Sequence, residues 1–213
     1  VERSRGLGDV YKRQDEAFDA DLDAIHASLA PLGWDVRACH DQVRAEPYLL
    51  VVNAKSDELA QVATPYSAAE LQYIKALVHA IFHTPQYAVP SIQALQLATH
   101  TQPVPLTKQT ATQLLANLER RQWLHHLPSG AYTLTLRALH ELDTYIRHEV
   151  DEACVLECMA CYAIVTRGVR CASCRGAVHT SCQSAYEAGH ATCTLCGVAW
   201  QPVPVSYTHL RAH

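Results

Sequence analysis

Residues 158–196 read CMACYAIVTRGVRCASCRGAVHTSCQSAYEAGHATCTLC, and this stretch decides the fold. It contains four pairs of metal-ligand residue types, and two residues separate the members of each pair. The pairs are Cys158 with Cys161, Cys171 with Cys174, His179 with Cys182, and Cys193 with Cys196. A gap of two residues lets both side chains of a pair reach one tetrahedral ion. Eight ligands therefore predict two zinc ions.

The predicted zinc ions are structural, because protein side chains fill all four positions around each ion and leave none for substrate. The segment has few large apolar residues, so we expect metal binding, worth roughly 10–16 kcal/mol per site, to supply much of its folding energy. A disulfide framework is the alternative, but a histidine occupies a ligand position and no secretory signal precedes it. Cys39 and Cys154 are predicted to be buried thiols.

The ligand order of four cysteines, one histidine and three cysteines resembles that of RING-variant and PHD fingers. In both families the pairs interleave around two ions. The resemblance implies one ion held by Cys158, Cys161, His179 and Cys182, and another held by Cys171, Cys174, Cys193 and Cys196. Most PHD fingers carry a tryptophan where this chain has Ala191, and the ten residues between Cys182 and Cys193 are few for a PHD finger. The RING-like interpretation is therefore favoured.

The composition fits two or three small domains, with 213 residues, 49% of them hydrophobic, and a formal net charge of -4. No apolar run is long enough to predict a membrane span. Residues 1–14 and 205–213 lack the periodicity of their neighbours and resemble translated adapter sequence, so we expect both to be non-native. They hold five basic but only two acidic residues, so the remaining chain is more acidic. This balance argues against broad nucleic-acid binding.

Residues 15–64 are predicted to be the C-terminal part of a truncated first winged helix. Apolar residues recur at helical spacing from Phe18 to Leu32, and Gly33 ends the predicted helix, which begins at Asp15. Residues 34–39 and 48–52 have the pattern of two strands, with a turn over 41–47 between them. A helix followed by a hairpin is the last part of a winged helix.

Residues 65–150 are predicted to form a second, complete winged helix. A capping box of Ser67 and Glu70 opens a helix that continues to about Phe82. The further predicted elements are helices over 91–98, 107–122 and 135–147, and a hairpin over 124–134. With the zinc domain at 154–201, the predicted fold class is α+β: tandem winged-helix domains, the first truncated, followed by a small cross-brace two-zinc RING-like domain.

The third helix of a winged helix often reads DNA, so its cations are the candidate DNA contacts. They are Lys108, Arg120, Arg121, His125 and His126. Strong binding needs several cations on one face, and we therefore expect direct DNA binding to be weak or dependent on a partner. The other histidines, His79 and His83 among them, are expected at the surface. The sequence contains no catalytic triad, no Gly-rich phosphate loop and no paired-carboxylate motif.

Across residues 15–201 the order of parts resembles the non-SMC element 1 family, RING-like subunits of an SMC-family DNA-repair complex. Local matches support the resemblance. They are EPYLLVVN at 46–53, SAAELQYIKALV at 67–78, RRQWL at 120–124, GAYTLTLRALHELDTYI at 130–146 and CTLCGVAW at 193–200. The resemblance implies a nuclear protein whose winged helices bind a MAGE-type non-SMC element 3, joined by the kleisin non-SMC element 4.

The resemblance also implies a RING-type E3 ubiquitin transferase that the MAGE partner strengthens. Such a module performs no covalent chemistry; it binds a ubiquitin-conjugating enzyme and orients its thioester. The candidate docking contacts are Met159, Ile164 and Leu195, and the alternative is that they pack beside the zinc sites. Ala160, Thr194 and Gly197 depart from the residues of typical ligases, so the isolated chain is expected to have low activity. Two alternatives are a non-catalytic scaffold of the same complex and a PHD-like chromatin reader.

Overall fold

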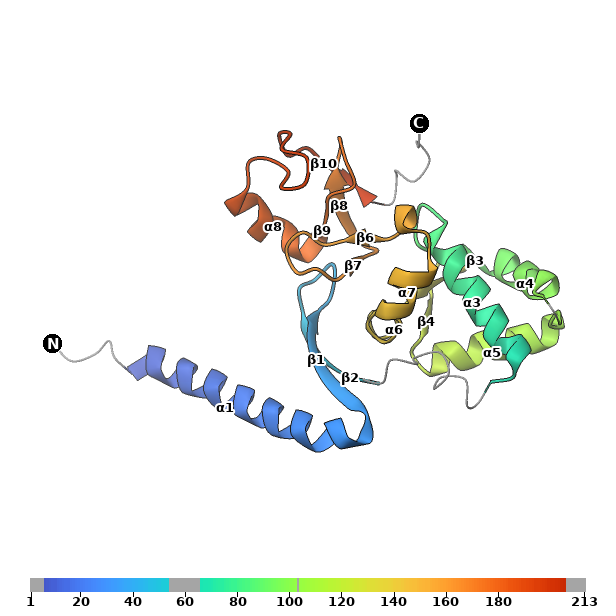
Figure 1. Cartoon of the computed structure of the whole chain (residues 1–213), viewed down its shortest axis with the longest axis horizontal. Coiled ribbons are helices and arrows are strands. Elements are labelled where there is room, and N and C mark those ends of the chain that lie inside the picture. Colours follow the sequence, from blue (N-terminus) through green and yellow to red (C-terminus); the bar gives the residue numbers. More distant parts are fainter. Residues whose placement is uncertain (1–5, 54–65, 103, 206–213) are drawn as a thin grey trace. The chain divides into compact units, whose positions relative to one another are not determined.

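The computed structural model describes residues 6–53, 66–102 and 104–205, in which helices and strands alternate as a mixed α/β fold (Figure 1). The chain divides into two compact units. The first comprises Val1–Cys39 and Leu49–Ser56, and the second His40–Tyr48 and Asp57–His213. None of the helices in the described ranges combines the length and the apolar character that crossing a bilayer requires.

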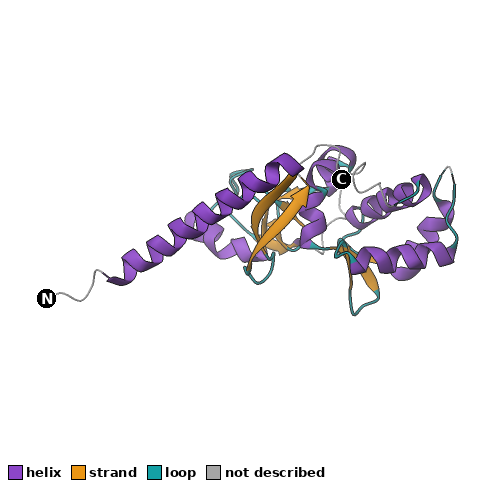
Figure 2. Ribbon diagram, turned by 90° about the horizontal axis from the view of Figure 1, so that it is seen from below, coloured by secondary structure: helices purple, strands orange, loops and turns teal. Residues whose placement is uncertain are grey.

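A long helix and a hairpin form the described part of the first unit, and the two strands lie side by side in Figure 2. The elements are α1 (Gly6–Leu29), the 3₁₀ helix η1 (Ala30–Leu32), β1 (Trp34–His40) and β2 (Pro47–Asn53). Gly33 ends the helical segment as predicted, with φ 80°, which favours glycine. The helix begins at Gly6 rather than at the predicted Asp15, because residues 6–14 contain no proline to break it.

The predicted apolar stripe of α1 remains on the surface. Phe18 is 52% exposed, Ile25 47% and Leu32 67%. On the hairpin, Trp34 and Val51 are 40% and 50% exposed. We call Phe18 and Ile25 of α1, together with Leu32 of the following η1, the α1 apolar face. Adjacent exposed apolar side chains of this kind are typical of a protein-binding surface.

Three helices and a three-stranded sheet, followed by two short helices, form the described part of the helix–hairpin region, residues 66–149. The elements are α3 (Ala68–Phe82), β3 (Val89–Pro90), α4 (Ser91–His100), α5 (Lys108–Arg120), β4 (Leu124–His126) and β5 (Ala131–Leu134). The sheet is antiparallel in the order β3-β5-β4, and Leu124 lies opposite Leu134. Gly130 turns the hairpin with φ 79°.

The capping box predicted for α3 is confirmed. The Ser67 hydroxyl accepts a hydrogen bond from the Glu70 amide at 3.3 Å, and the Glu70 carboxylate accepts one from the Ser67 amide at 2.7 Å. The face predicted for α5 is also buried, namely Ala111, Leu114, Leu115 and Leu118. Full burial of a leucine side chain contributes about 1.5–3 kcal/mol, so these faces account for much of the core.

The single helix predicted over 135–147 is wrong, because the structure has two shorter helices there. They are α6 (Leu136–Glu141) and α7 (Asp143–Glu149). The break falls at Leu142, which is fully buried, and Asp143 starts the next helix, where an acidic side chain is favoured. His79 also departs from its predicted surface position. It is half-buried, and its Nε2 lies 3.2 Å from the Tyr145 hydroxyl.

Short strands and one helix form the cysteine-rich region, residues 152–205. The elements are η2 (Glu152–Cys154), β6 (Leu156–Glu157), β7 (Ile164–Val165), β8 (Gly168–Cys171), β9 (Ala177–His179), α8 (Thr180–Gly189) and β10 (Pro202–Pro204). β6 pairs with β7, and a second sheet has the order β10-β8-β9.

The cysteine-rich region extends beyond residue 201, where the sequence analysis ends it. In β10, Val203 pairs with Arg170 of β8. Val205, predicted to open a non-native tail, is only 1% exposed and packs in the core. Strand pairing and apolar burial therefore include residues 202–205 in the fold. The rest of the predicted tail, 206–213, lies outside the described residues.

Candidate metal centres

The structure gathers the eight predicted ligands into two groups, each of which could hold a metal ion. The first group is Cys158, Cys161, His179 and Cys182, and the second is Cys171, Cys174, Cys193 and Cys196. Within each group the ligand atoms all lie within 4.8 Å of one another. Each group takes one pair from the first half of the segment and one from the second, which is the interleaved arrangement expected from the resemblance.

Strand ends and loops position the ligands of both groups. The first pair lies in the loop between β6 and β7, Cys171 ends β8, and His179 ends β9. Cys182 lies in the first turn of α8, and the last pair lies in the loop between α8 and β10. Cys158, Cys171 and Cys193 are at most 1% exposed. The small sheet β10-β8-β9 therefore fixes residues of both groups.

The sulfur separations fit tetrahedral metal coordination. The Cys171 and Cys196 sulfurs are 3.8 Å apart, and the Cys174 and Cys193 sulfurs 3.6 Å. A tetrahedral ion with metal–sulfur bonds of about 2.3 Å requires sulfurs about 3.8 Å apart. A disulfide would require about 2.05 Å. All nine cysteines of the chain lie in the described ranges and are free thiols, so the disulfide framework is excluded.

His179 is oriented for coordination by the carbonyl oxygen of Ile164. Its Nδ1 lies 3.3 Å from the Cys161 sulfur and 3.8 Å from the Cys182 sulfur. Its Nε2 lies 3.1 Å from the Ile164 oxygen. This hydrogen bond assigns the ring proton to Nε2 and leaves the Nδ1 lone pair for a metal, which is the usual support for a ligating histidine.

Hydrogen bonding and close packing also characterise the ligand groups. A hydrogen bond from the Cys161 thiol lowers the pKa of Cys158 and favours its thiolate, the form that binds metal. The Gly176 amide donates to the Cys174 sulfur at 3.3 Å. A Cβ at Gly176 would lie 2.8 Å from the Met159 sulfur and 3.0 Å from the Cys193 sulfur, so a larger residue there would displace the Met159 side chain and crowd a ligand.

One of the three predicted docking contacts is wrong. Ile164 is only 3% exposed because it belongs to β7 and packs in the core, so its side chain is not available to a partner. Leu195 is 65% exposed, and Met159 is half-buried. Tyr162, which sequence reasoning missed, is 69% exposed with φ 62°. Met159, Tyr162 and Leu195 together line a groove of about 460 Å³, which we call the docking groove.

Gln42 is a second residue that sequence reasoning missed. The sequence places it in a turn, yet it is 7% exposed and hydrogen-bonded to the cysteine-rich region. Its Nε2 donates to the Ile164 carbonyl at 2.9 Å. Its Oε1 accepts from the amides of Thr166 and Arg167 at 3.0 and 2.9 Å. No local pattern could have found these contacts, because the partners are over 120 residues away along the chain.

Two arginines bond to the backbone near the first group, Arg147 from α7 and Arg175 from within the cysteine-rich region. Arg147 of α7 donates to the carbonyl oxygen of Tyr162 at 2.8 Å and forms an ion pair with Glu157. Arg175 donates to the carbonyl oxygens of Val155 and Glu152. These bonds fix the backbone on both sides of Cys158. The docking groove therefore has a rigid floor.

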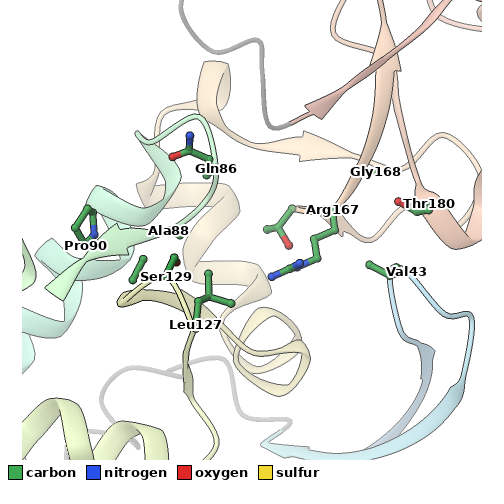
Figure 3. Close-up of a pocket in the computed structure, with 11 residues that line it drawn as sticks. Val43, Gln86, Ala88, Pro90, Leu127, Ser129, Arg167, Gly168 and Thr180 are labelled. Atoms are coloured by element: carbon green, nitrogen blue, oxygen red, sulfur yellow. The ribbon is translucent and has the colours of Figure 1, made fainter.

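A larger cavity of about 710 Å³ lies between the hairpin β4–β5 and the cysteine-rich region (Figure 3). Its lining residues are Val43, Gln86, Ala88, Pro90, Leu127, Ser129, Ala131, Thr166, Arg167, Gly168 and Thr180. Figure 3 shows the Arg167 side chain extending toward Leu127. Arg167 is the only charged residue of this lining, which has no carboxylate, histidine or cysteine.

One of the predicted DNA-contacting cations takes part in the fold. Arg121 donates to the Tyr66 hydroxyl at 3.0 Å, and its guanidinium lies 5.5 Å from the centre of that ring. Lys108 and Arg120 are exposed.

Comparison with known proteins identifies similarity in both sequence and fold. Residues 8–142 match the family described as the Nse1 non-SMC component of the SMC5-6 complex. Non-structural maintenance of chromosomes element 1 homolog of Xenopus laevis is 25% identical over 187 residues, covering 87% of this chain and 68% of that protein. The Schizosaccharomyces pombe protein named element 1 is 27% identical over 181 residues, covering 84% and 75%.

The fold is similar to that of a chain in a solved Nse1-Nse3-Nse4 complex. The TM-score is 0.71 at 24% sequence identity, and the match covers 86% of this chain and 79% of that one. The family resemblance seen in the sequence is thereby confirmed.

The contacts of Gln42 predict that Gln42→Ala destabilises the protein. The substitution removes the hydrogen bonds of a buried side chain and leaves the part-buried amides of Thr166 and Arg167 without their acceptor, so we expect a loss of about 1–3 kcal/mol in the free energy of unfolding. Urea denaturation of the full chain measures it. The matched control is Gln86→Ala at an exposed position, which should change stability little. Equal effects of the two substitutions would contradict the role given to Gln42.

Proposed function

Because the chain belongs to the family of Nse1, the non-SMC component of the SMC5-6 complex, we propose that it is a zinc-containing ubiquitin-ligase subunit of such a complex. The observation that carries the proposal is the pair of interleaved four-ligand groups beside an exposed groove. We also propose that the protein is located in the nucleus and takes part in DNA repair.

We further propose that the finer fold is two winged helices and a RING-like domain. Three helices followed by an antiparallel hairpin support a winged helix over residues 65–150. A helix and a hairpin support the last part of another over 15–64. The interleaved ligand groups support the RING-like domain.

Zinc is the proposed ion in both groups. Thiolates and a neutral imidazole are ligands that suit zinc, and the sulfur separations fit its tetrahedral geometry. Bound zinc would supply folding free energy to a region with a small apolar core. Four protein ligands at each ion leave no open position, so the ions hold structure and take no part in chemistry.

The docking groove is the proposed site for a ubiquitin-conjugating enzyme. Tyr162 and Leu195 offer exposed apolar contacts, and Met159 supports them from below, where its sulfur lies 3.3 Å from the Thr194 hydroxyl. This chain supplies no reacting group. It orients the thioester so that a substrate lysine amine attacks the carbonyl carbon and the thiol of the conjugating enzyme leaves, an effect of proximity and orientation.

A non-catalytic scaffold is the second candidate, and two departures from typical ligases favour it. Gly197 has φ 73° and offers no basic side chain after the last ligand. The Thr194 amide donates to the Tyr186 hydroxyl at 3.0 Å, a bond that the proline common at this position could not make. Low activity of the isolated chain is therefore expected even if the groove binds the enzyme.

The proposed partners are Nse3, of the MAGE type, and the kleisin Nse4, because the solved complex of similar fold contains both. The α1 apolar face is the proposed contact for Nse3, because its side chains are exposed and apolar. Direct DNA binding is proposed to be weak or supplied by the partners. Of the three predicted basic residues at α5, Arg121 is hydrogen-bonded to Tyr66, which leaves Lys108 and Arg120 as the exposed candidates for phosphate contacts.

Metal analysis tests the zinc proposal. The full chain should retain about two zinc equivalents after dialysis against a weak chelator, and His179→Ala should retain about one, because the first group loses a ligand. His190→Ala is the matched control, since His190 is exposed and lies outside both groups. Retention of fewer than two equivalents by the unsubstituted chain would contradict the proposal.

Thioester discharge tests the docking groove. With the Nse3-type partner and a conjugating enzyme charged with ubiquitin, Tyr162→Ala and Leu195→Ala should each slow discharge about tenfold while zinc content stays unchanged. The reason is that each side chain is exposed and supports no metal ligand. Val198→Ala, at a 47% exposed position outside the groove, is the control. If neither groove substitution changes the rate of discharge, the result would favour the non-catalytic scaffold.

Co-purification tests the α1 apolar face. Phe18→Asp with Ile25→Asp places two charges on the face and should reduce recovery of the Nse3-type partner at least about tenfold, since an unpaired charge in an apolar interface costs several kcal/mol. Ala27→Asp, on an exposed position of the same helix outside the face, should leave recovery unchanged. Full recovery with the double variant would assign the face to a different contact.

A further inference from the structure

A third group of possible metal ligands lies outside the two four-ligand groups already described. It comprises His83, Asp151 and Cys154, whose ligand atoms all lie within 4.8 Å of one another. We propose that this group binds a third zinc ion, more weakly than the two four-ligand groups bind theirs. The ion would connect the C-terminal end of α3 to the segment that precedes Cys158.

The backbone of η2 places the carboxylate and the thiol together. The Cys154 amide donates to the Asp151 carbonyl oxygen at 2.8 Å, and the Asp151 carboxylate accepts from the Ala153 amide at 2.9 Å. Asp151 is the N-cap residue of η2 and Cys154 is its last residue, so one short turn carries both ligands. Their ligand atoms lie within 4.8 Å of each other.

His83 is oriented by the same kind of hydrogen bond that orients His179. It lies at the C-terminal cap of α3, where its Nδ1 is 2.7 Å from the His79 carbonyl oxygen. This bond assigns the ring proton to Nδ1 and leaves the Nε2 lone pair for a metal. The orientation of the imidazole is thus set before any ion arrives.

Other contacts hold the two ligand-bearing segments, the end of α3 and the η2 turn, in place. The Tyr87 hydroxyl donates to the Cys154 carbonyl oxygen at 3.2 Å and so joins η2 to the loop after α3. Arg175 donates to the carbonyl oxygens of Glu152 and Val155 on both sides of the turn. Binding therefore requires little ordering of the chain, which lowers its entropic cost.

The donor set favours zinc over magnesium or calcium. An imidazole and a thiolate with one carboxylate suit zinc, whereas the alkaline-earth ions require oxygen ligands. Three protein ligands leave a fourth tetrahedral position, which water would fill. One ligand fewer than in the other groups, together with the exposure of His83 and Asp151, gives the expected lower affinity.

A zinc titration of the full chain, already holding its two tightly bound ions, tests the proposal. With a competing fluorescent chelator, the unsubstituted chain should bind one further equivalent, and His83→Ala should weaken this binding at least about tenfold. The matched control is His100→Ala. His100 ends α4 with the same bond, from its Nδ1 to the Gln96 carbonyl oxygen at 2.8 Å, but belongs to no ligand group in the described residues.

Alkylation of Cys154 provides a second measurement that does not depend on ion counting. Added zinc should slow modification of Cys154, read by peptide mass spectrometry, in the unsubstituted chain but not in His83→Ala. Cys39, the other cysteine outside the two four-ligand groups, is the internal control and should react at the same rate with and without zinc.

Equal alkylation of Cys154 with and without zinc, or a third equivalent that survives in His83→Ala, would overturn the third site. This test is independent of the proposal that the two four-ligand groups hold zinc, because that proposal is tested by the ions that remain bound after dialysis. If the chain retains fewer than two ions, that proposal fails, and the alkylation of Cys154 still decides the third site.

Discussion

The carbonyl oxygen of Ile164 is the acceptor on which the rest of the cysteine-rich region depends. It accepts hydrogen bonds from His179 Nε2 at 3.1 Å and from Gln42 Nε2 at 2.9 Å, one for each of its two lone pairs. The first bond sets the ring that faces the first ligand group, and the second attaches the turn between β1 and β2. The orientation of a ligand and the anchoring of this turn therefore share a single backbone atom.

This shared acceptor belongs to a set of backbone hydrogen bonds that support a region with few apolar side chains. Gln42 and Arg147, from two other parts of the chain, and Arg175, from within the region, all bond to backbone carbonyls close to the ligands. Backbone acceptors are available whatever side chain stands at the position. The attachment thus leaves Tyr162 and Leu195 free for surface contacts.

Much of the fold and of the candidate site could be predicted because the signals are local. Paired ligands two residues apart indicate the metal groups, the Ser67–Glu70 box marks the start of α3, and helical spacing identifies the buried face of α5. The grouping of the pairs came from the family resemblance, since spacing alone does not say which pairs share an ion.

What could not be predicted depends on contacts between distant segments. The burial of Ile164 follows from the core around β7, and the role of Gln42 from partners over 120 residues away. In the sequence, nothing distinguishes His83 and Asp151 from ordinary surface residues, because only the fold brings the end of α3 close to η2. The break at Leu142 reflects tertiary burial that overrides a continuous helical pattern.

The pairing of β10 with β8 has a consequence for how the protein is made. β8 ends at Cys171, and its outer partner is the strand at residues 202–204. During synthesis, neither ligand group can be completed until the later cysteines have emerged from the ribosome, and the sheet that fixes them closes only afterwards. The helix–hairpin region can fold first, as domains generally do in order of emergence, and can then hold the nascent cysteines near their final places while metal is acquired.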